Sequence, residues 1–468
     1  MLIVGKNDFK LAPVVQNDPN GGGLYFLNIV KRTYAIKDDI GSLEAIPEEE
    51  QPDIVGANSY KDDYGRSQKY PGDSGACKQL IDVIINGCAF APEGEAVEEL
   101  DVTINIAGKH KTLRVFGNRH WERNEAGGVD ISATQPFTTM PIRWEKAFGS
   151  LSNRWNPLGM GSEKDHETDP EDPLFSLPNV ENPEDLLTQF GQKVRPVGFS
   201  AIPEAWEPRR SFFGTRSAYW SSFRAPLPPK DQDLRYLNAA PEDQQFGDLI
   251  GNEIIILTNM HERFSEMAIK LPDSKPRLFY VPRKRPVDLQ DTELDLQDTE
   301  LDLQDTELIE TYLKLDTVVI DLNEKFLTLV WKGKLESQIN VLDTFLYMYG
   351  VEDSCEPSKS IGEIQRKFEE EIVALEWARE MIDENPEKKI NKVVSDVTDQ
   401  IVKTLKELKA DPALISLLAS TATLDEKEKM LRAEFDNLKE SLEKDLMKQK
   451  EKIRSWGNAP STNFEETN

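Results

Sequence analysis

Cysteine and long apolar runs are both scarce in this chain of 468 residues. Its three cysteines, Cys77, Cys88 and Cys355, are an odd number without a Cys-x-x-Cys pair, which argues against a disulfide framework and favours a reducing compartment. No segment approaches the roughly 18 to 20 apolar residues of a membrane span. Residues 1–10 become charged too early for the apolar region of a signal peptide. We therefore expect a cytoplasmic protein with no membrane partner.

Residue patterns typical of catalysis, metal binding or cofactor binding are also sparse. No zinc-ligand spacing joins the histidines, and no Lys-Ser/Thr pair follows the glycine-rich segments 21–23 and 156–161, as a phosphate-binding loop would require. Ser74 and Ser150 lie beside glycines but lack the sequence context of a nucleophile. The four histidines are His110, His120, His166 and His261. We expect no catalytic residue, no metal and no cofactor, and hence a protein that is not an enzyme.

Basic charge is low relative to acidic charge. The chain has 56 Lys and Arg against 84 Asp and Glu, which gives a formal net charge of −28. Proteins that bind nucleic acids normally present a basic surface to the phosphates, so nucleic acid is not an expected partner. With 38% hydrophobic and 8% aromatic residues, the composition is that of a globular chain with a substantial core, and its length suits two or three domains.

The N-terminal part, residues 1–355, is predicted to be a β-rich domain. Its short runs of β-branched and aromatic residues are bounded by Gly, Pro and Asn, which is typical of strands, and a two-sheet, sandwich-like core is the natural arrangement. Such runs are residues 24–30, 82–86, 102–106 and 113–116. Between about 149 and 245 the chain is irregular and rich in Pro, Gly, Asn and Trp, which predicts long ordered loops that bind something or move.

An acidic insertion is predicted at residues 286–309. Within it, residues 288–308 repeat Asp-Leu-Gln-Asp-Thr-Glu-Leu three times without change, and the leucine spacing fits neither a coiled coil nor a strand. A solvated insertion between strands is preferred over an acidic recognition arm. After it, residues 315–321 and 326–331 predict a β-hairpin with its turn at 321–324.

A separate helical domain is predicted at residues 359–456. Apolar residues recur there at helical spacing, and Asn385-Pro386 and Asp411-Pro412 mark helix ends. Residues 457–468 are predicted to be a disordered tail. The expected fold class is therefore α+β, a mainly β domain followed by an α-helical one.

One stretch, residues 206–224, concentrates aromatic and arginine side chains in an otherwise acidic chain. Trp, Tyr and Arg dominate the binding energy of many protein interfaces, although they also pack as a layer over a core. Most of these side chains are expected to pack against the core and a minority to be exposed for binding. The candidate protein-binding residues are Trp206, Arg209, Arg210, Arg216, Tyr219, Trp220 and Arg224.

Several strings, in order and spanning roughly residues 25 to 335, match the pattern of a known family. They are Asp82–Pro92, Leu113–Arg119 with Trp121, Gln135–Pro141, Trp144–Gly149, Asn156–Gly159, Leu177–Val180, Gly198–Phe199, Trp206 with Arg209, Gly214–Thr215 with Trp220, Ala239–Gln245 and Gly251–Glu253. In these strings the chain resembles the DUF2169 family of bacterial proteins associated with type VI secretion. The sequence differs from the family pattern at Asn118, Ser150 and Arg216, where the family often has Asp, Gly and Tyr.

The resemblance implies a chaperone or adaptor that holds a secreted effector, or its PAAR-type tip domain, and helps to load it onto a VgrG-type spike protein. Two alternatives remain open. A hydrolase of envelope polymers could use loop carboxylates, for which Asp165, Asp169 and Glu171 are candidates, and an immunity protein would bind the active domain of a toxin.

Overall fold

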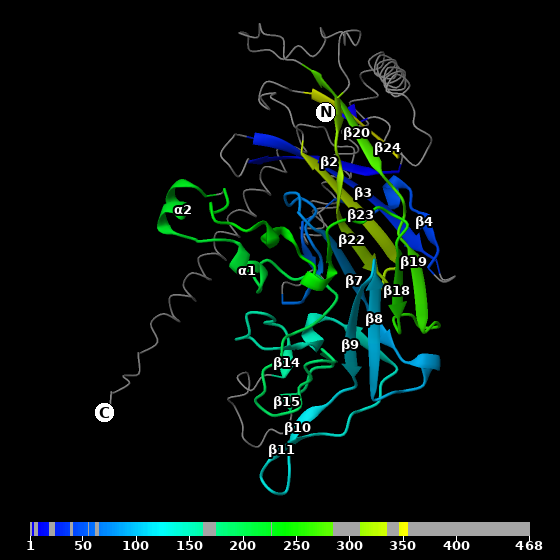
Figure 1. Cartoon of the computed structure of the whole chain (residues 1–468), viewed down its shortest axis with the longest axis vertical. Helices are drawn as coiled ribbons and strands as arrows, with labels where there is room; N and C mark the ends of the chain where they lie inside the picture. Colours follow the sequence, from blue (N-terminus) through cyan, green and yellow to red (C-terminus); the bar gives the residue numbers. More distant parts are fainter. Residues whose placement is uncertain are drawn as a thin grey trace, which may run out of the picture. The chain divides into compact units, whose positions relative to one another are not determined.

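The computed structural model describes residues 2–3, 8–17, 24–37, 41–54, 56–60, 65–161, 175–225, 227–283, 309–334 and 346–353 (Figure 1). All of them belong to the first of the two units into which the chain divides, Met1–Ile372. The predicted helical domain at 359–456, the tail at 457–468 and all but Ile309 of the insertion at 286–309 lie outside the described residues.

The larger sheet has eight strands, in which β7 and β22 run parallel and the other pairs run antiparallel. Its strands are β12 (Thr139–Ile142), β7 (Ile81–Phe90), β22 (Lys314–Asp321), β23 (Phe326–Lys334), β3 (Leu24–Ile36) and β2 (Lys10–Asn17), with β17 (Gln245–Phe246) on β7 and β4 (Leu43–Ala45) on β3. Strands β22 and β23 form the predicted hairpin, and their turn begins at Leu322.

The second large sheet has five antiparallel strands. They are, in spatial order, β16 (Val180–Glu181), β9 (Lys109–Phe116), β8 (Glu99–Ile106), β18 (Ile254–Thr258) and β19 (Glu266–Lys270).

Smaller sheets and short helices complete the described part of the chain. The remaining strands are β1 (Leu2–Ile3), β24 (Leu346–Asp353), β20 (Pro276–Arg283) and β21 (Ile309–Thr311) in one sheet, β11 (Val129–Ile131), β10 (His120–Arg123) and β15 (Phe175–Ser176) in another, and the pairs β13 (Phe148–Gly149) with β14 (Met160–Gly161) and β5 (Asn58–Ser59) with β6 (Gln68–Tyr70). The helices are α1 (Arg209–Phe212), α2 (Ala218–Phe223) and the 3₁₀ turns η1 (Glu48–Glu50), η3 (Pro92–Gly94), η4 (Trp144–Lys146), η6 (Leu234–Leu237) and η7 (Glu242–Gln244). None of these helices is long and apolar enough to cross a membrane.

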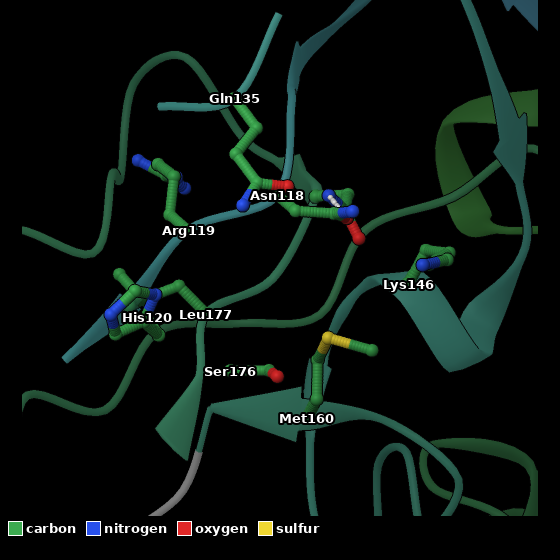
Figure 2. A pocket seen from close by; sticks show the side chains of 9 residues that line it. Asn118, Arg119, His120, Gln135, Lys146, Met160, Ser176 and Leu177 are labelled. Atoms are coloured by element: carbon green, nitrogen blue, oxygen red, sulfur yellow. Dashed lines mark hydrogen bonds between the residues drawn. The ribbon is translucent and has the colours of Figure 1, made fainter. Parts of the chain in front are cut away.

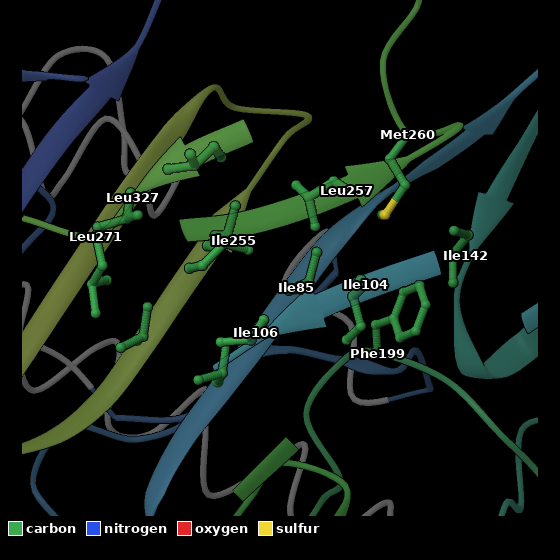
Figure 3. Close-up of a cluster of buried hydrophobic side chains, with 14 of the residues drawn as sticks. Ile85, Ile104, Ile106, Ile142, Phe199, Ile255, Leu257, Met260, Leu271 and Leu327 are labelled. Atoms are coloured by element: carbon green, nitrogen blue, oxygen red, sulfur yellow. The ribbon is translucent and has the colours of Figure 1, made fainter. Parts of the chain in front are cut away.

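The main core contains side chains from both large sheets (Figure 3). Along β8, Val102, Ile104 and Ile106 are buried and alternate with partly exposed residues, as expected where one face of a strand meets a core. Ile85 of β7 and Leu257 of β18 belong to the same cluster. The prediction of a mainly β domain is confirmed, and no long helix interrupts the described residues before position 280.

Loops cover the face of the larger sheet that is turned away from the main core. A buried ionic cluster joins one of these loops to the sheet. The Lys78 ammonium lies 2.9 Å from Asp82 Oδ2 and 3.2 Å from Asp316 Oδ2, and Lys332 Nζ is also 3.2 Å from Asp316 Oδ2. Asp316 is the extra residue of a β-bulge in β22, between Leu315 and Thr317 in the register. All four charged side chains are buried, so each depends on its partners for stabilisation.

The proton affinities of this cluster reflect both burial and charge. Burial raises the pKa of Asp316, but Lys78 and Lys332 outweigh it and hold the pKa below 3.8. Burial lowers the pKa of Lys78, but Asp316 and Asp82 outweigh it and hold the pKa above 10.5. Burial lowers the pKa of Lys332, which Asp316 only partly offsets. Asp316 and Lys78 are therefore ionised at neutral pH, and their ion pair fixes the loop around Lys78 to the sheet.

Candidate functional site

The aromatic and arginine stretch folds into an excursion of the chain, residues 203–237, that carries α1 and α2. Figure 1 shows both helices to one side of the strands, with α2 farther from the sheets than α1. The excursion leaves the covered face of the larger sheet near Ile202 and returns to it near Asn238, where the chain is again buried. Its two ends are thus anchored in the scaffold, and its middle extends away from it.

Two buried side chains form the base of the excursion. The Trp206 ring meets Trp144 edge to face, with centroids 6.1 Å apart, in the main core. Arg209 donates from Nη1 to the carbonyl of Ile202 at 2.7 Å and from Nε to the carbonyl of Tyr236 at 2.9 Å. Burial lowers the pKa of the Arg209 guanidinium, which Glu204 partly offsets. Because Arg209 donates to carbonyls at both ends of the excursion, it holds these two ends together.

The returning chain is held by the ionic cluster. Asp82 accepts a hydrogen bond from Asn238 Nδ2 at 2.8 Å and another from the backbone N–H of Ala239 at 2.7 Å. The same carboxylate pairs with Lys78. The ionic cluster on this face of the larger sheet therefore also determines where the excursion ends.

A layer of half-buried rings lies above the base. Phe213 packs edge to face on Trp220, with centroids 5.8 Å apart, and on Tyr236 at 5.1 Å, while Arg216 lies 4.4 Å from its ring centroid. Trp220 Nε1 donates to the carbonyl of Leu227 at 2.8 Å, which fixes the indole. Burial, with Glu204 second, raises the pKa of Tyr236 to about 12. These contacts give the short helices a defined position.

The tip of the excursion exposes two aromatic rings. Ser217 caps α2 by accepting from the N–H of Trp220, and the i, i+4 spacing places Tyr219 and Phe223 on one face of the helix. Tyr219 is 66% exposed and Phe223 is 78% exposed, and their centroids are 5.3 Å apart. Large apolar side chains that gather at the surface of a well-packed scaffold mark a candidate interaction site.

The charge at the tip is opposite to that of the whole chain. Residues 210–224 contain three arginines and no acidic residue, whereas the chain carries −28. Arg210 and Arg216 are exposed, and Arg224 is half-buried and donates to the carbonyl of Pro228. A partner that covers the rings would therefore also meet guanidinium groups.

The structure divides the seven predicted binding residues into three groups. Arg210, Arg216 and Tyr219 are exposed, Trp220 and Arg224 are half-buried, and Trp206 and Arg209 are buried. Most of the arginine and aromatic side chains thus support the excursion, and fewer present a surface. Phe223 is the exposed residue that the prediction did not include, although its position four residues after Tyr219 in a short helix was a usable signal.

The described residues contain no group of three or more His, Cys, Asp or Glu that could hold a metal ion. Cys77 and Cys88 are free thiols, and burial raises the pKa of each. Asp165, Asp169 and Glu171, the carboxylates considered for hydrolysis, lie outside the described residues.

Comparison with known proteins identifies the family. The family model DUF2169, described as an uncharacterized protein conserved in bacteria, matches residues 22–332, about two thirds of the chain. No curated protein and no solved structure matches the chain. The chain belongs to the DUF2169 family, and the matched range includes most strands of both large sheets and the whole excursion with α1 and α2.

Proposed function

We propose that this member of the DUF2169 family is a non-catalytic adaptor that binds another protein through the tip of the α1–α2 excursion. The observation that carries the proposal is the exposed pair Tyr219 and Phe223 on a base anchored by Trp206 and Arg209. Tyr and Arg at an exposed, preorganised position are the residue types that supply binding energy in protein interfaces.

Preorganisation lowers the entropic cost of binding. The rings and helices at the tip are already fixed by the Ser217 cap, the Trp220 indole bond and the packing around Phe213. Less conformational freedom is lost on association when contact groups are held in place beforehand. A binding surface on such a base needs no catalytic pocket.

The charges suggest what the partner presents. At contact, Arg210 and Arg216 favour acidic groups around an apolar surface that receives Tyr219 and Phe223. At longer range, the net charge of −28 favours encounter with a partner of net basic charge and keeps the free adaptor soluble.

The partner we propose is a type VI secretion effector or its PAAR-type tip domain, which the adaptor would hold in the cytoplasm and help to load onto a VgrG-type spike. The resemblance of the sequence strings to the family supports this part of the proposal, and the geometry of the excursion supports only the protein-binding part. No specific observation in the described residues favours a hydrolase or an immunity protein.

The test is affinity purification from the native host with three baits: the parent chain, the double variant Tyr219→Ala/Phe223→Ala, and the control Tyr312→Ala, which removes another exposed ring. We expect the parent and the control to capture an effector or tip protein together with the spike, and the double variant to lose both. Capture of a toxin's active domain alone would indicate an immunity protein, and equal capture by all three baits would contradict the proposed surface.

A further inference from the structure

A surface cavity is lined by residues of β10, β14, β15 and η4 and of the loops next to them. Its volume is about 290 Å³, at the small end of the range for ligand sites. Figure 2 shows Asn118 and Gln135 on one side, Met160 and Ser176 on the other, and His120 and Lys146 at the two ends. None of the residues that line this cavity has a carboxylate.

Backbone hydrogen bonds hold the cavity walls together. The N–H of Asn179 donates to the carbonyl of Lys146 at 2.8 Å, and the N–H of Gln135 donates to the carbonyl of Asn118 at 3.0 Å. Asn179 also donates from Nδ2 to Asn118 Oδ1 at 3.2 Å, which leaves the Nδ2 group of Asn118 as a donor. The backbone of the cavity walls and the Asn118 amide are therefore held in place before any ligand arrives.

Arg119 is a buried part of the wall. Its Nη2 donates to the carbonyl of Pro178 and to Glu181, and its guanidinium lies 3.6 Å from the ring centroid of Phe116. Its Nε is buried and has no hydrogen-bond partner in the described part of the chain. Burial lowers the pKa of Arg119 and raises that of Glu181, so each charge needs the other. Within the described residues, the single negative charge of Glu181 is therefore balanced by Arg119 alone.

Lys146 is a second cation in the lining of the cavity. It is half-buried at the end of η4, and its ammonium group makes no hydrogen bond or ion pair with any described residue. Among the residues that the structure describes, the formal charges of Arg119, Glu181 and Lys146 leave one net positive charge at the cavity. A single carboxylate would balance this charge and accept hydrogen bonds from Lys146 and from the amides of Asn118 and Gln135.

We propose that this cavity binds one carboxylate group, with Lys146 as its main cation and the amide groups of Asn118 and Gln135 as donors. The volume fits a group the size of an amino-acid side chain. The carboxylate belongs either to a peptide, as an acidic side chain or a C-terminus, or to a small free acid. A phosphate dianion would exceed the positive charge that the described residues of the cavity supply.

Met160 supplies a reporter inside the cavity. In the full chain labelled with ¹³C at methionine methyl groups, its resonance is assigned with the variant Met160→Leu. The probes are N-acetylglutamate α-amide for a side chain, N-acetyl-glycylglycine for a C-terminus and glutarate for a free acid, with the neutral N-acetylglutamine amide as control. We expect at least one carboxylate to shift the Met160 resonance in a saturable way, and the probe with the highest affinity identifies the source.

Substitutions at Lys146 test the charge. Lys146→Gln should weaken binding about tenfold or more, because a charge-assisted hydrogen bond is lost, whereas Lys146→Arg should keep it. Lys230→Gln changes an exposed lysine within the α1–α2 excursion, which is not part of the cavity lining, and should bind like the parent. No shift with any carboxylate, equal shifts with the neutral amide, or unchanged affinity in Lys146→Gln would each overturn the proposal.

Discussion

Tyr219 and Phe223 lie with their ring centroids 5.3 Å apart on α2, and both are more than half exposed. Ten residues before Tyr219, Arg209 is buried and bonded to carbonyls on both sides of the same excursion. A short segment thus combines an anchored base with an apolar tip. The base should matter for stability and the tip for binding, and these roles can be separated by mutation.

Truncation of the base should destabilise the fold. Trp206→Ala removes a buried indole that packs on Trp144, and we expect a loss of about 3–5 kcal/mol in the free energy of unfolding. Tyr219→Ala removes an exposed ring and should change that free energy by no more than about 0.5 kcal/mol. Urea denaturation of both variants measures the difference. Equal losses would show that the tip is also structural.

The ionic cluster should be sensitive to the removal of one partner. Lys78→Met leaves Asp82 buried without its ion-pair partner and Asp316 with Lys332 alone, so we expect a loss of about 3–5 kcal/mol in unfolding free energy. The control is Lys230→Met, which replaces an exposed lysine and should be nearly neutral. Denaturant titrations at pH 7 compare the two. A neutral effect of Lys78→Met would contradict the stabilising role assigned to Lys78.

Acid should weaken the same cluster. The pKa of Asp316 is held below its ordinary value by Lys78 and Lys332 against the opposing effect of burial. Its stabilising contribution is therefore complete above about pH 4, the pKa in the unfolded chain, and is lost as the pH falls through the lower folded pKa. We expect the free energy of unfolding to fall more steeply between pH 5 and 3 in the parent than in Asp316→Asn. Parallel profiles from denaturant titrations would rule out this contribution.

Close backbone packing should make the substitution of Gly117 destabilising. A Cβ atom at Gly117 would lie 1.8 Å from the carbonyl oxygen of Gln135, so Gly117→Ala must displace backbone beside the cavity, and we expect a cost of about 1–3 kcal/mol or more. Gly247→Ala has open space around the added methyl group and serves as the control. Thermal unfolding of both variants measures the effect. A parent-like melting temperature for Gly117→Ala would contradict the close approach.

Strand patterns explain why much of the fold could be predicted. Val102, Ile104 and Ile106 alternate along β8 and indicate a half-buried strand by themselves. Arg209 shows what the sequence does not predict. It is the direct neighbour of Arg210 and has the same side chain, yet Arg209 is buried and Arg210 is exposed. That difference depends on the carbonyls of Ile202 and Tyr236, which only the folded chain brings to the guanidinium.

The cavity could not be predicted for the same reason. Asn118, Lys146 and Ser176 come from separate segments, and no spacing in the sequence connects them. Backbone hydrogen bonds between loops bring them together, such as the bond from Asn179 to Lys146. Phe223, in contrast, was within reach, because its spacing from Tyr219 is a local property of a short helix.

Recognition of a partner protein by the α2 tip is tested most directly by the affinity of the purified partner for variants of that tip. Calorimetric titration should show at least about 25-fold weaker binding to Tyr219→Ala/Phe223→Ala, because truncated hot-spot residues cost 2 kcal/mol or more, and unchanged binding to Tyr312→Ala. Parent-like binding by the folded double variant, with loss of binding in a chain truncated after Glu356, would contradict the account and assign recognition to the C-terminal region.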